Sequence, residues 1–219
     1  MKNSVRIMAL ALLMSVVCWF AIGLVDADTQ INIVNQCSQT ISACQTDQSG
    51  QITSYALGSG ANQLIDVGTS WPGGLIWGYP GGSADPTDCN TAKPQADLAE
   101  FTIGANNKDS YDLSNVNAYN LPLQIAPTSP VTSSGTTCGS PSCTINNVNS
   151  FCQSPNTLTG APGDGCYNVD GPPSTSPTNG TEQFDNACPE AISYSTDTTG
   201  KVYGCQTGTN YEVVFCPSS

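Results

Sequence analysis

Residues 98–128, LAEFTIGANNKDSYDLSNVNAYNLPLQIAPT, decide the fold of this 219-residue chain. Apolar and polar residues alternate in this stretch, which is the pattern of β-strands that bury one face of a sheet. Phe101 and Ile103 share one face while Glu100 takes the other, and Asp112 likewise lies opposite its apolar neighbours. The pattern predicts a sheet with carboxylates on one face. Such a face is either a working site or an ordinary solvated surface, since exposed Asp and Glu are common.

The rest of the chain repeats short β-type runs between clusters of Gly, Pro, Ser, Thr and Asn. They lie at residues 30–35, 51–56, 64–67, 75–77, 201–203 and 211–215. Short strands at this spacing are typical of all-β sandwiches and barrels, so we expect an all-β fold. A short helix is expected only at 181–187, where Cys188-Pro189 would end it.

The N-terminus has the features of a secretory signal peptide. Lys2 and Arg6 precede an apolar run at 7–24, and the small residues that signal peptidase prefers lie just before Asp28. We therefore expect cleavage after residue 27 and an extracellular protein. A transmembrane anchor is the weaker alternative, because no second apolar run or stop-transfer charge cluster follows.

Ten of the eleven cysteines lie in the mature chain that this cleavage would release. An even number of cysteines in a secreted protein indicates disulfides, here five. Sequence spacing alone leaves their pairing open. The ten are Cys37, Cys44, Cys89, Cys138, Cys143, Cys152, Cys166, Cys188, Cys205 and Cys216.

The mature chain is strongly acidic and lacks two basic residue types. It has three lysines, no arginine and no histidine against sixteen acidic residues, a net charge of −13. This charge disfavours nucleic acid and anionic membrane surfaces as partners. Without histidine, no Ser-His-Asp or Cys-His nucleophile and no imidazole metal site can form, so we expect no metal and no cofactor. Acid-base chemistry would have to use carboxylates, and neutral polysaccharides or basic protein surfaces are compatible partners.

The composition changes over a segment from about Pro127 to Gly180. Ser, Thr, Asn, Gly and Pro dominate it and strand-forming residues are few, so cross-links must supply much of its order. We expect a loop-rich disulfide subdomain at 145–188, attached to a sandwich core formed by 28–144 and 189–219. Asn179, in Asn-Gly-Thr, is the expected N-glycosylation acceptor of the mature chain.

Six stretches carry a family resemblance: INIVNQCSQT at 31–40, LAEFTI at 98–103, DSYDLSNVNAYNLPLQIAPT at 109–128, APGDGC at 161–166, CPEAISY at 188–194 and NYEVVFCP at 210–217. In this order they resemble the thaumatin-like proteins, which include osmotin-type plant defence proteins. The cysteine count is closest to the small, ten-cysteine members. The resemblance implies a flattened antiparallel β-sandwich, a disulfide-rich, loop-dominated second subdomain, and an acidic cleft between them.

In that family the cleft is lined by one arginine, one glutamate and three aspartates. The glutamate falls on Glu100, and two aspartates fall on Asp112 and Asp197. Tyr79 stands at the arginine position and Asn117 at the remaining aspartate position. The resemblance thus implies that these five residues bind the ligand, with less charge than the family pattern has.

The resemblance also implies how the cysteines pair. Four disulfides follow from it, namely Cys37–Cys216, Cys138–Cys205, Cys143–Cys188 and Cys152–Cys166. The two cysteines that remain, Cys44 and Cys89, would then pair with each other.

One function that fits this site is weak endo-β-1,3-glucanase activity. Glycoside hydrolysis needs one protonated and one ionised carboxyl group. Glu100 would be the acid, because glutamate has the higher reference pKa, and Asp112 or Asp197 would be its partner. The three form the candidate catalytic set.

The other function is binding without turnover, which we prefer because two charges that could tune the pair are absent. The carboxylates would accept sugar hydroxyls, and Tyr79, Tyr111 or Tyr119 would stack on a sugar ring. We therefore expect a monomeric, antifungal, pathogenesis-related protein of the apoplast or cell wall. Its partner would be β-1,3-glucan or a similar neutral polysaccharide.

Overall fold

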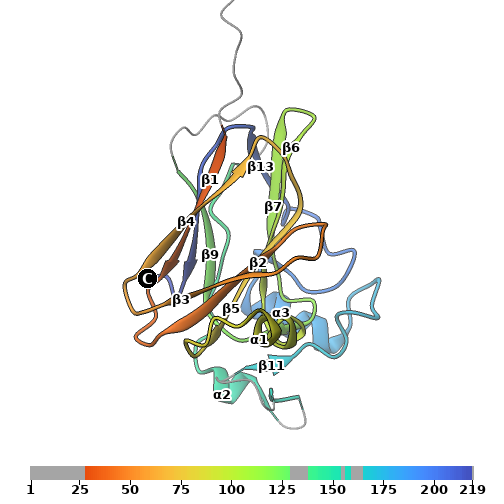
Figure 1. The fold of residues 1–219 in the computed structure, drawn as a ribbon. Coiled ribbons are helices and arrows are strands. Elements are labelled where there is room, and N and C mark those ends of the chain that lie inside the picture. Colours follow the sequence, from red (N-terminus) through yellow and green to blue (C-terminus); the bar gives the residue numbers. More distant parts are fainter. Residues whose placement is uncertain (1–27, 129–137, 154–155, 159–164, 219) are drawn as a thin grey trace, which may run out of the picture.

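The computed structural model describes residues 28–128, 138–153, 156–158 and 165–218, which form a sandwich of two β-sheets (Figure 1). The expected signal peptide, residues 1–27, lies outside this part of the chain. No helix within these ranges is long and apolar enough to cross a membrane.

One side of the sandwich is a five-stranded sheet with the strand order β10-β9-β14-β1-β4. β1 pairs antiparallel with β4 and parallel with β14, so the first and last strands lie side by side (Figure 1). The strands are β1 (Thr29–Asn35), β4 (Asn62–Gly68), β9 (Leu123–Pro127), β10 (Ser142–Cys143) and β14 (Tyr211–Phe215).

The other side is a seven-stranded sheet with the order β12-β7-β6-β5-β2-β3, in which β13 also pairs with β7. The strands are β2 (Ile41–Thr46), β3 (Thr53–Leu57), β5 (Trp71–Pro80), β6 (Leu98–Ala105), β7 (Lys108–Ser114), β12 (Ala191–Ile192) and β13 (Tyr203–Gln206). The long pairs, β3-β2-β5-β6-β7, are all antiparallel. The expected all-β fold is therefore confirmed. A separate two-stranded sheet joins β8 (Ala118–Tyr119) to β11 (Cys166–Tyr167).

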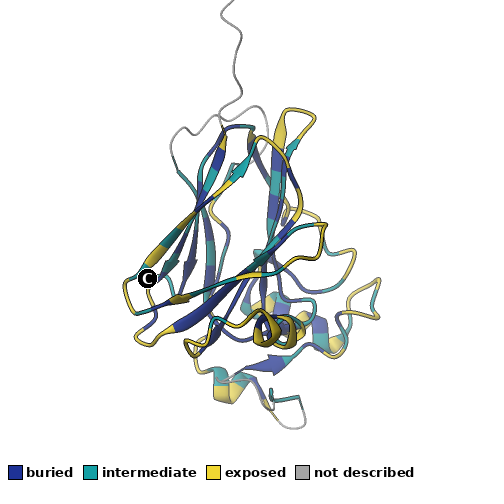
Figure 2. Cartoon of the chain, viewed as in Figure 1, coloured by how far each residue is buried: buried dark blue, intermediate teal, exposed yellow. Residues whose placement is uncertain are grey.

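The main core lies between the two sheets, where alternate residues of each strand are buried (Figure 2). Phe101 of β6, Tyr111 of β7 and Tyr211 of β14 form an aromatic cluster across the sandwich, with ring centroids 5.2 to 6.0 Å apart. Gly78 of β5 faces Phe215 of β14, and a Cβ at Gly78 would lie 2.7 Å from the ring. The absence of a side chain at Gly78 therefore sets how closely the sheets approach.

The expected helix at 181–187 is confirmed as α3 (Asn179–Ala187). It begins two residues earlier because the Thr178 hydroxyl accepts a hydrogen bond from the Thr181 backbone N–H at 3.2 Å, which caps the helix. The Asn179 side chain is exposed in its first turn. Glycosylation of Asn179 stays a prediction.

Two helices were not expected, α1 (Pro86–Ala92) and the single turn α2 (Val148–Phe151). The signal for α1 is its start, where the Asp85 carboxylate accepts from the Thr87 N–H at 2.7 Å and proline follows at the first helical position. The short helix carries no apolar stripe long enough for periodicity to reveal it.

A second, smaller core lies on the outer face of the seven-stranded sheet. There α1 and the 3-10 turn η1 (Lys93–Gln95) cover Trp77 and Tyr79 of β5. The disulfide Cys44–Cys89 ties β2 to α1, and the Trp77 indole N–H donates to the Cys89 carbonyl at 3.0 Å. This anchored helix shields one end of the face that carries Glu100.

Five disulfides join the described cysteines, and they are the same five pairs as those expected above. Cys37–Cys216 joins the chain after β1 to the chain after β14. Cys44–Cys89 is the pair formed by the two cysteines that the family resemblance did not assign. The bonds are Cys37–Cys216, Cys44–Cys89, Cys138–Cys205, Cys143–Cys188 and Cys152–Cys166.

Within residues 145–188 lie α2, β11 and α3, and Cys143–Cys188 links the two ends of this segment. The division of the chain into a sandwich core and this subdomain stays a prediction.

Asp97 is a buried acid that pattern reasoning did not single out. Its side chain is 2% exposed, and one carboxylate oxygen faces the backbone N–H groups of Asn120 and Leu121 at 3.4 and 3.3 Å. Burial raises its pKa from 3.8 to about 7. The folded protein therefore holds a proton here that the unfolded chain releases near pH 4.

Removing the disulfide that joins the first and last strands should cost more than removing a short-range one. Cys37–Cys216 closes a sequence separation of 179 residues and Cys152–Cys166 one of 14. Loop-closure entropy is about 5 kcal/mol for the first and about 3 kcal/mol for the second. We expect Cys37→Ala/Cys216→Ala to lower the free energy of unfolding in urea more than Cys152→Ala/Cys166→Ala. Equal losses would contradict this ranking.

Asp97→Asn should stabilise the protein at high pH but not at low pH. Because the folded-state pKa of Asp97 is raised, ionisation destabilises the fold as pH rises from about 4 to about 7, a cost on the order of 4 kcal/mol. Asparagine keeps an oxygen acceptor but cannot ionise. Urea unfolding at pH 4 and pH 8 should show a gain for Asp97→Asn only at pH 8. The exposed control Asp28→Asn should show none, and equal effects of Asp97→Asn at both values would refute the argument.

Candidate functional site

The candidate site is built on one cross-strand pair, Glu100 of β6 and Asp112 of β7. The two residues are directly opposite in the antiparallel ladder, as are Phe101 and Tyr111 on the buried face. Side chains opposite one another in such a pair have Cβ atoms about 4.5–5.5 Å apart. The register that buries the aromatic rings therefore also brings the two carboxyl groups together on the outer face.

The surroundings of the two carboxyl groups differ. Glu100 receives a hydrogen bond from the Ser114 hydroxyl and lies in the field of Lys93, and both lower its pKa against the larger effect of burial, which raises it. Asp112 has neither aid, and its Oδ1 is buried without a hydrogen-bond partner among the described residues. Burial first and the Glu100 charge second raise the pKa of Asp112 to about 8.

Asp112 is therefore the member of the pair that holds a proton at neutral pH, because burial and the Glu100 charge raise its pKa to about 8. Like charges at this spacing cannot both ionise without a large cost. This order reverses the expectation from reference pKa values, which made Glu100 the acid. The physical reason is that Glu100 has the hydroxyl donor and the nearby cation.

A shallow depression of about 100 Å³ opens over the pair. The hydroxyls of Thr102 and Ser110 and the glycines Gly73 and Gly74 contribute to its wall. At Gly74 a Cβ would lie 2.2 Å from the Trp71 ring, so no side chain can stand there. Pockets that enclose small molecules are typically about 300–1,000 Å³, so this depression can contact an edge of a ligand but cannot enclose one.

Lys93 is a site residue that the sequence reasoning did not single out. Its Nζ lies 5.5 Å from the centre of the Trp77 ring, which fixes the ammonium beside the sheet face. Neither of the other two lysines of residues 28–219 has this position. Lys201 forms ion pairs with two aspartates, and Lys108 is exposed at the start of β7. Lysine is rare in this acidic chain, and that rarity could have marked Lys93 as a residue to consider for the site.

Three tyrosines proposed as stacking faces are buried in the core, and this corrects the expectation. Tyr79 is 4% exposed, and its hydroxyl shares a hydrogen bond with Ser83 Oγ at 2.9 Å. Tyr111 and Tyr119 are each 1% exposed. The Tyr79 ring lies in the smaller core that α1 covers, so it cannot stack on a sugar.

Asp197 has a structural partner set of its own. Its Oδ2 accepts hydrogen bonds from the Ser193 N–H at 2.9 Å and the Ser193 hydroxyl at 3.0 Å, and it forms an ion pair with Lys201. The same lysine pairs with Asp185 of α3. Asp197 therefore orders the loop after β12 and links it to α3, and it is not among the causes of the raised pKa values of Glu100 and Asp112.

Asn117 is half-buried at the end of the β7-β8 connection. Its backbone carbonyl accepts from the Asn168 N–H at 2.9 Å, next to the β8-β11 pair. Of the five expected site residues, the structure thus joins Glu100 and Asp112 in one depression.

The described part of the chain holds no group of three or more His, Cys, Asp or Glu side chains arranged to bind a metal ion. Carboxyl groups and hydroxyls are the polar side chains of the depression.

The fold and site define a class of protein: a disulfide-linked β-sandwich with a cross-strand carboxyl pair on an outer sheet face. Comparison with known proteins identifies the family. The sequence model of the Thaumatin family matches residues 35–217. The chain belongs to the thaumatin family.

Individual relatives are about 30% identical over most of the chain. Thaumatin-like protein 1 of Pyrus pyrifolia is 33% identical over 202 residues, covering 75% of this chain and 80% of that protein. A glucan endo-1,3-beta-glucosidase of Prunus avium is 32% identical over 227 residues, covering 85% and 90%. Pathogenesis-related thaumatin-like protein 3.2 of Cryptomeria japonica is 31% identical over 212 residues, covering 84% of this chain and 87% of that protein.

The assignment of the proton to Asp112 predicts a specific titration. In wild type the Asp112 side-chain carboxyl carbon should titrate near pH 8 in ¹³C NMR, and Glu100→Gln should lower that pKa because the neighbouring charge is gone. Lys93→Gln should raise the pKa of Glu100, since a stabilising cation is removed. The matched control Lys108→Gln, on the exposed start of β7, should leave both values unchanged. Titration of Asp112 below pH 5 in wild type would refute the assignment.

Proposed function

We propose that this chain is a secreted thaumatin-like defence protein, antifungal and pathogenesis-related, that binds β-1,3-glucan or a similar neutral cell-wall polysaccharide. The binding surface is the depression over Glu100 and Asp112. Family membership supports the defence role, and five disulfides are typical of proteins from oxidising, extracellular compartments.

The observation that carries this proposal is the cross-strand pair of Glu100 and Asp112 in one depression on the outer sheet face. Protonated Asp112 can donate a hydrogen bond and ionised Glu100 can accept one, so the pair offers both partners that a sugar hydroxyl needs. The hydroxyls of Thr102 and Ser110 extend the same surface. A charge-assisted bond to Glu100 would be the strongest of these contacts.

The charge of the chain supports a neutral ligand. The formal net charge of the full chain is −12, so an anionic polymer would be repelled over the whole surface. Lys93 lies near Glu100 and offsets its charge, which leaves the depression without a free cation for an anion.

A weak endo-β-1,3-glucanase is the alternative, and the raised pKa of Asp112 favours it. Here Asp112 would protonate the leaving oxygen and Glu100 would be the nucleophile. The retaining mechanism needs carboxyl groups about 5–5.5 Å apart, whereas the inverting mechanism needs a wider separation. The close spacing of a cross-strand pair therefore suits the retaining mechanism better. The relative from Prunus avium carries a glucanase name. Binding without turnover is preferred because the depression is too small to enclose and distort a sugar ring.

A pull-down on insoluble β-1,3-glucan at several pH values tests the proposal. We expect binding near pH 6 and weaker binding above pH 8, where Asp112 ionises and the pair loses its donor. Asp112→Asn should bind without this pH dependence, because the amide keeps a donor. Glu100→Gln should bind up to about tenfold more weakly, since a neutral hydrogen bond replaces a charge-assisted one.

A reducing-sugar assay of the same mixtures separates the two functions. Binding without sugar release supports the binding protein, and release that Glu100→Gln abolishes supports the enzyme. The exposed control Asp28→Asn should behave as wild type. If wild type binds no glucan and Glu100→Gln and Asp112→Asn match it in every assay, the pair is a solvated sheet face and the proposal fails.

A further inference from the structure

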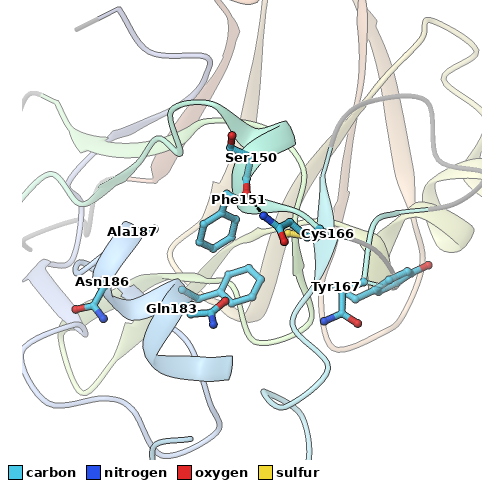
Figure 3. A pocket seen from close by; sticks show the side chains of 10 residues that line it. Ser150, Phe151, Cys166, Tyr167, Gln183, Asn186 and Ala187 are labelled. Carbon is cyan, nitrogen blue, oxygen red and sulfur yellow. Dashed lines mark hydrogen bonds between the residues drawn. The ribbon is translucent and has the colours of Figure 1, made fainter. Parts of the chain in front are cut away.

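A second cavity lies away from Glu100 and Asp112, between α2, β11 and α3 (Figure 3). Its volume is about 660 Å³, within the range of small-ligand sites, and it shares no lining residue with the acidic depression. In Figure 3 Phe151 projects from α2 toward α3, with Gln183 and Asn186 of α3 at the same opening and Tyr167 of β11 farther along it.

The walls of this cavity are held in place by covalent and packing contacts. Cys152–Cys166 fixes the end of α2 to β11. The Phe151 ring packs edge-on against the Phe184 ring of α3, with centroids 5.1 Å apart and planes at 90°. At the far end of α3, Cys188 is bonded to Cys143. A cavity with walls fixed in this way needs little ordering on binding, which favours affinity.

The lining is polar but uncharged. Four amide side chains contribute to it, from Gln153, Asn156, Gln183 and Asn186, and no described lining residue carries a charge. Gln183 and Asn186 are exposed and three residues apart on α3, so they lie on neighbouring positions of one helix face. No hydrogen bond within the described structure uses either of these two amides. The acid next to them in sequence, Asp185, is paired with Lys201.

We propose that this cavity is a binding site for a neutral oligosaccharide, distinct from the acidic depression. Each amide offers one acceptor and two donors, which matches the paired donor and acceptor of sugar hydroxyls. The aromatic rings of Phe151 and Tyr167 offer apolar surface for the C–H face of a sugar ring. Among the described lining residues an anion would meet no cation and a cation would meet no carboxylate. A purely apolar ligand would remove water from four amides without replacing their hydrogen bonds.

This inference does not depend on the function proposed for Glu100 and Asp112. Because none of the described lining residues is an acid, we expect sugar binding in the cavity to be independent of pH between 5 and 9. Binding at the carboxyl pair changes as Asp112 titrates. The two sites are therefore separable by pH as well as by position.

The test uses the ¹⁵N-labelled mature protein and three soluble neutral probes: laminarihexaose, xylohexaose and chitohexaose. We expect at least one to shift the side-chain amide signals of Gln183 and Asn186 in a saturable way, with equal affinity at pH 5 and pH 9. Gln183→Ala/Asn186→Ala should weaken this binding about tenfold or more, as expected for two lost hydrogen bonds. Both positions are exposed, so the fold should be retained.

Two controls keep the outcomes distinct. Glu182→Ala changes an exposed residue of the same helix outside the lining, and Glu100→Gln changes the other site, and both should bind as wild type does here. The proposal is overturned if none of the three sugars shifts these amide signals. It is also overturned if the shifts vanish in Glu100→Gln, or if a capped, uncharged hexapeptide binds the cavity while the sugars do not.

Discussion

The antiparallel register of β6 and β7 is the constraint on which the rest of this structure depends. It sets Phe101 opposite Tyr111 inside the sandwich and Glu100 opposite Asp112 outside it. A slip of one residue would exchange the two faces, burying two carboxyl groups and exposing two aromatic rings. The aromatic cluster with Tyr211 therefore fixes the chemistry of the outer face, because the same ladder carries both.

The carboxyl pair is chemically asymmetric because of elements far from it in sequence. The helix α1, fastened by Cys44–Cys89, leads into η1, which places Lys93 over Trp77 and near Glu100. Asp112 has no nearby cation or hydroxyl donor that lowers its pKa, so it holds the proton. Burial also raises the pKa of Asp97 and of Asp109, which is 1% exposed. Protonation of these acids as pH falls therefore favours the folded state.

Much of the fold could be predicted from the sequence. Alternating apolar residues located most of the long strands, although β2 (Ile41–Thr46) was missed. The placement of Glu100 and Asp112 on the face opposite the apolar residues followed from the same pattern. α3 was found from its flanking Cys188-Pro189, whereas α1 was missed because a seven-residue helix offers too few residues for a periodic signal. Of the site, the sequence supplied the carboxyl residues but misplaced the proton, and it gave no hint of the cavity beside α3.

What the sequence by itself determined is local or compositional: strand alternation, an even set of cysteines, and an acidic chain without histidine. The tertiary structure decided which of these residues meet. In the folded chain Tyr79 is buried under α1, and Asp197 binds Lys201 and Ser193. One carboxyl oxygen of Asp112 has no hydrogen-bond partner among the described residues. The reason is physical, since burial and charged neighbours set the pKa and availability of a side chain, and both come from residues distant in sequence.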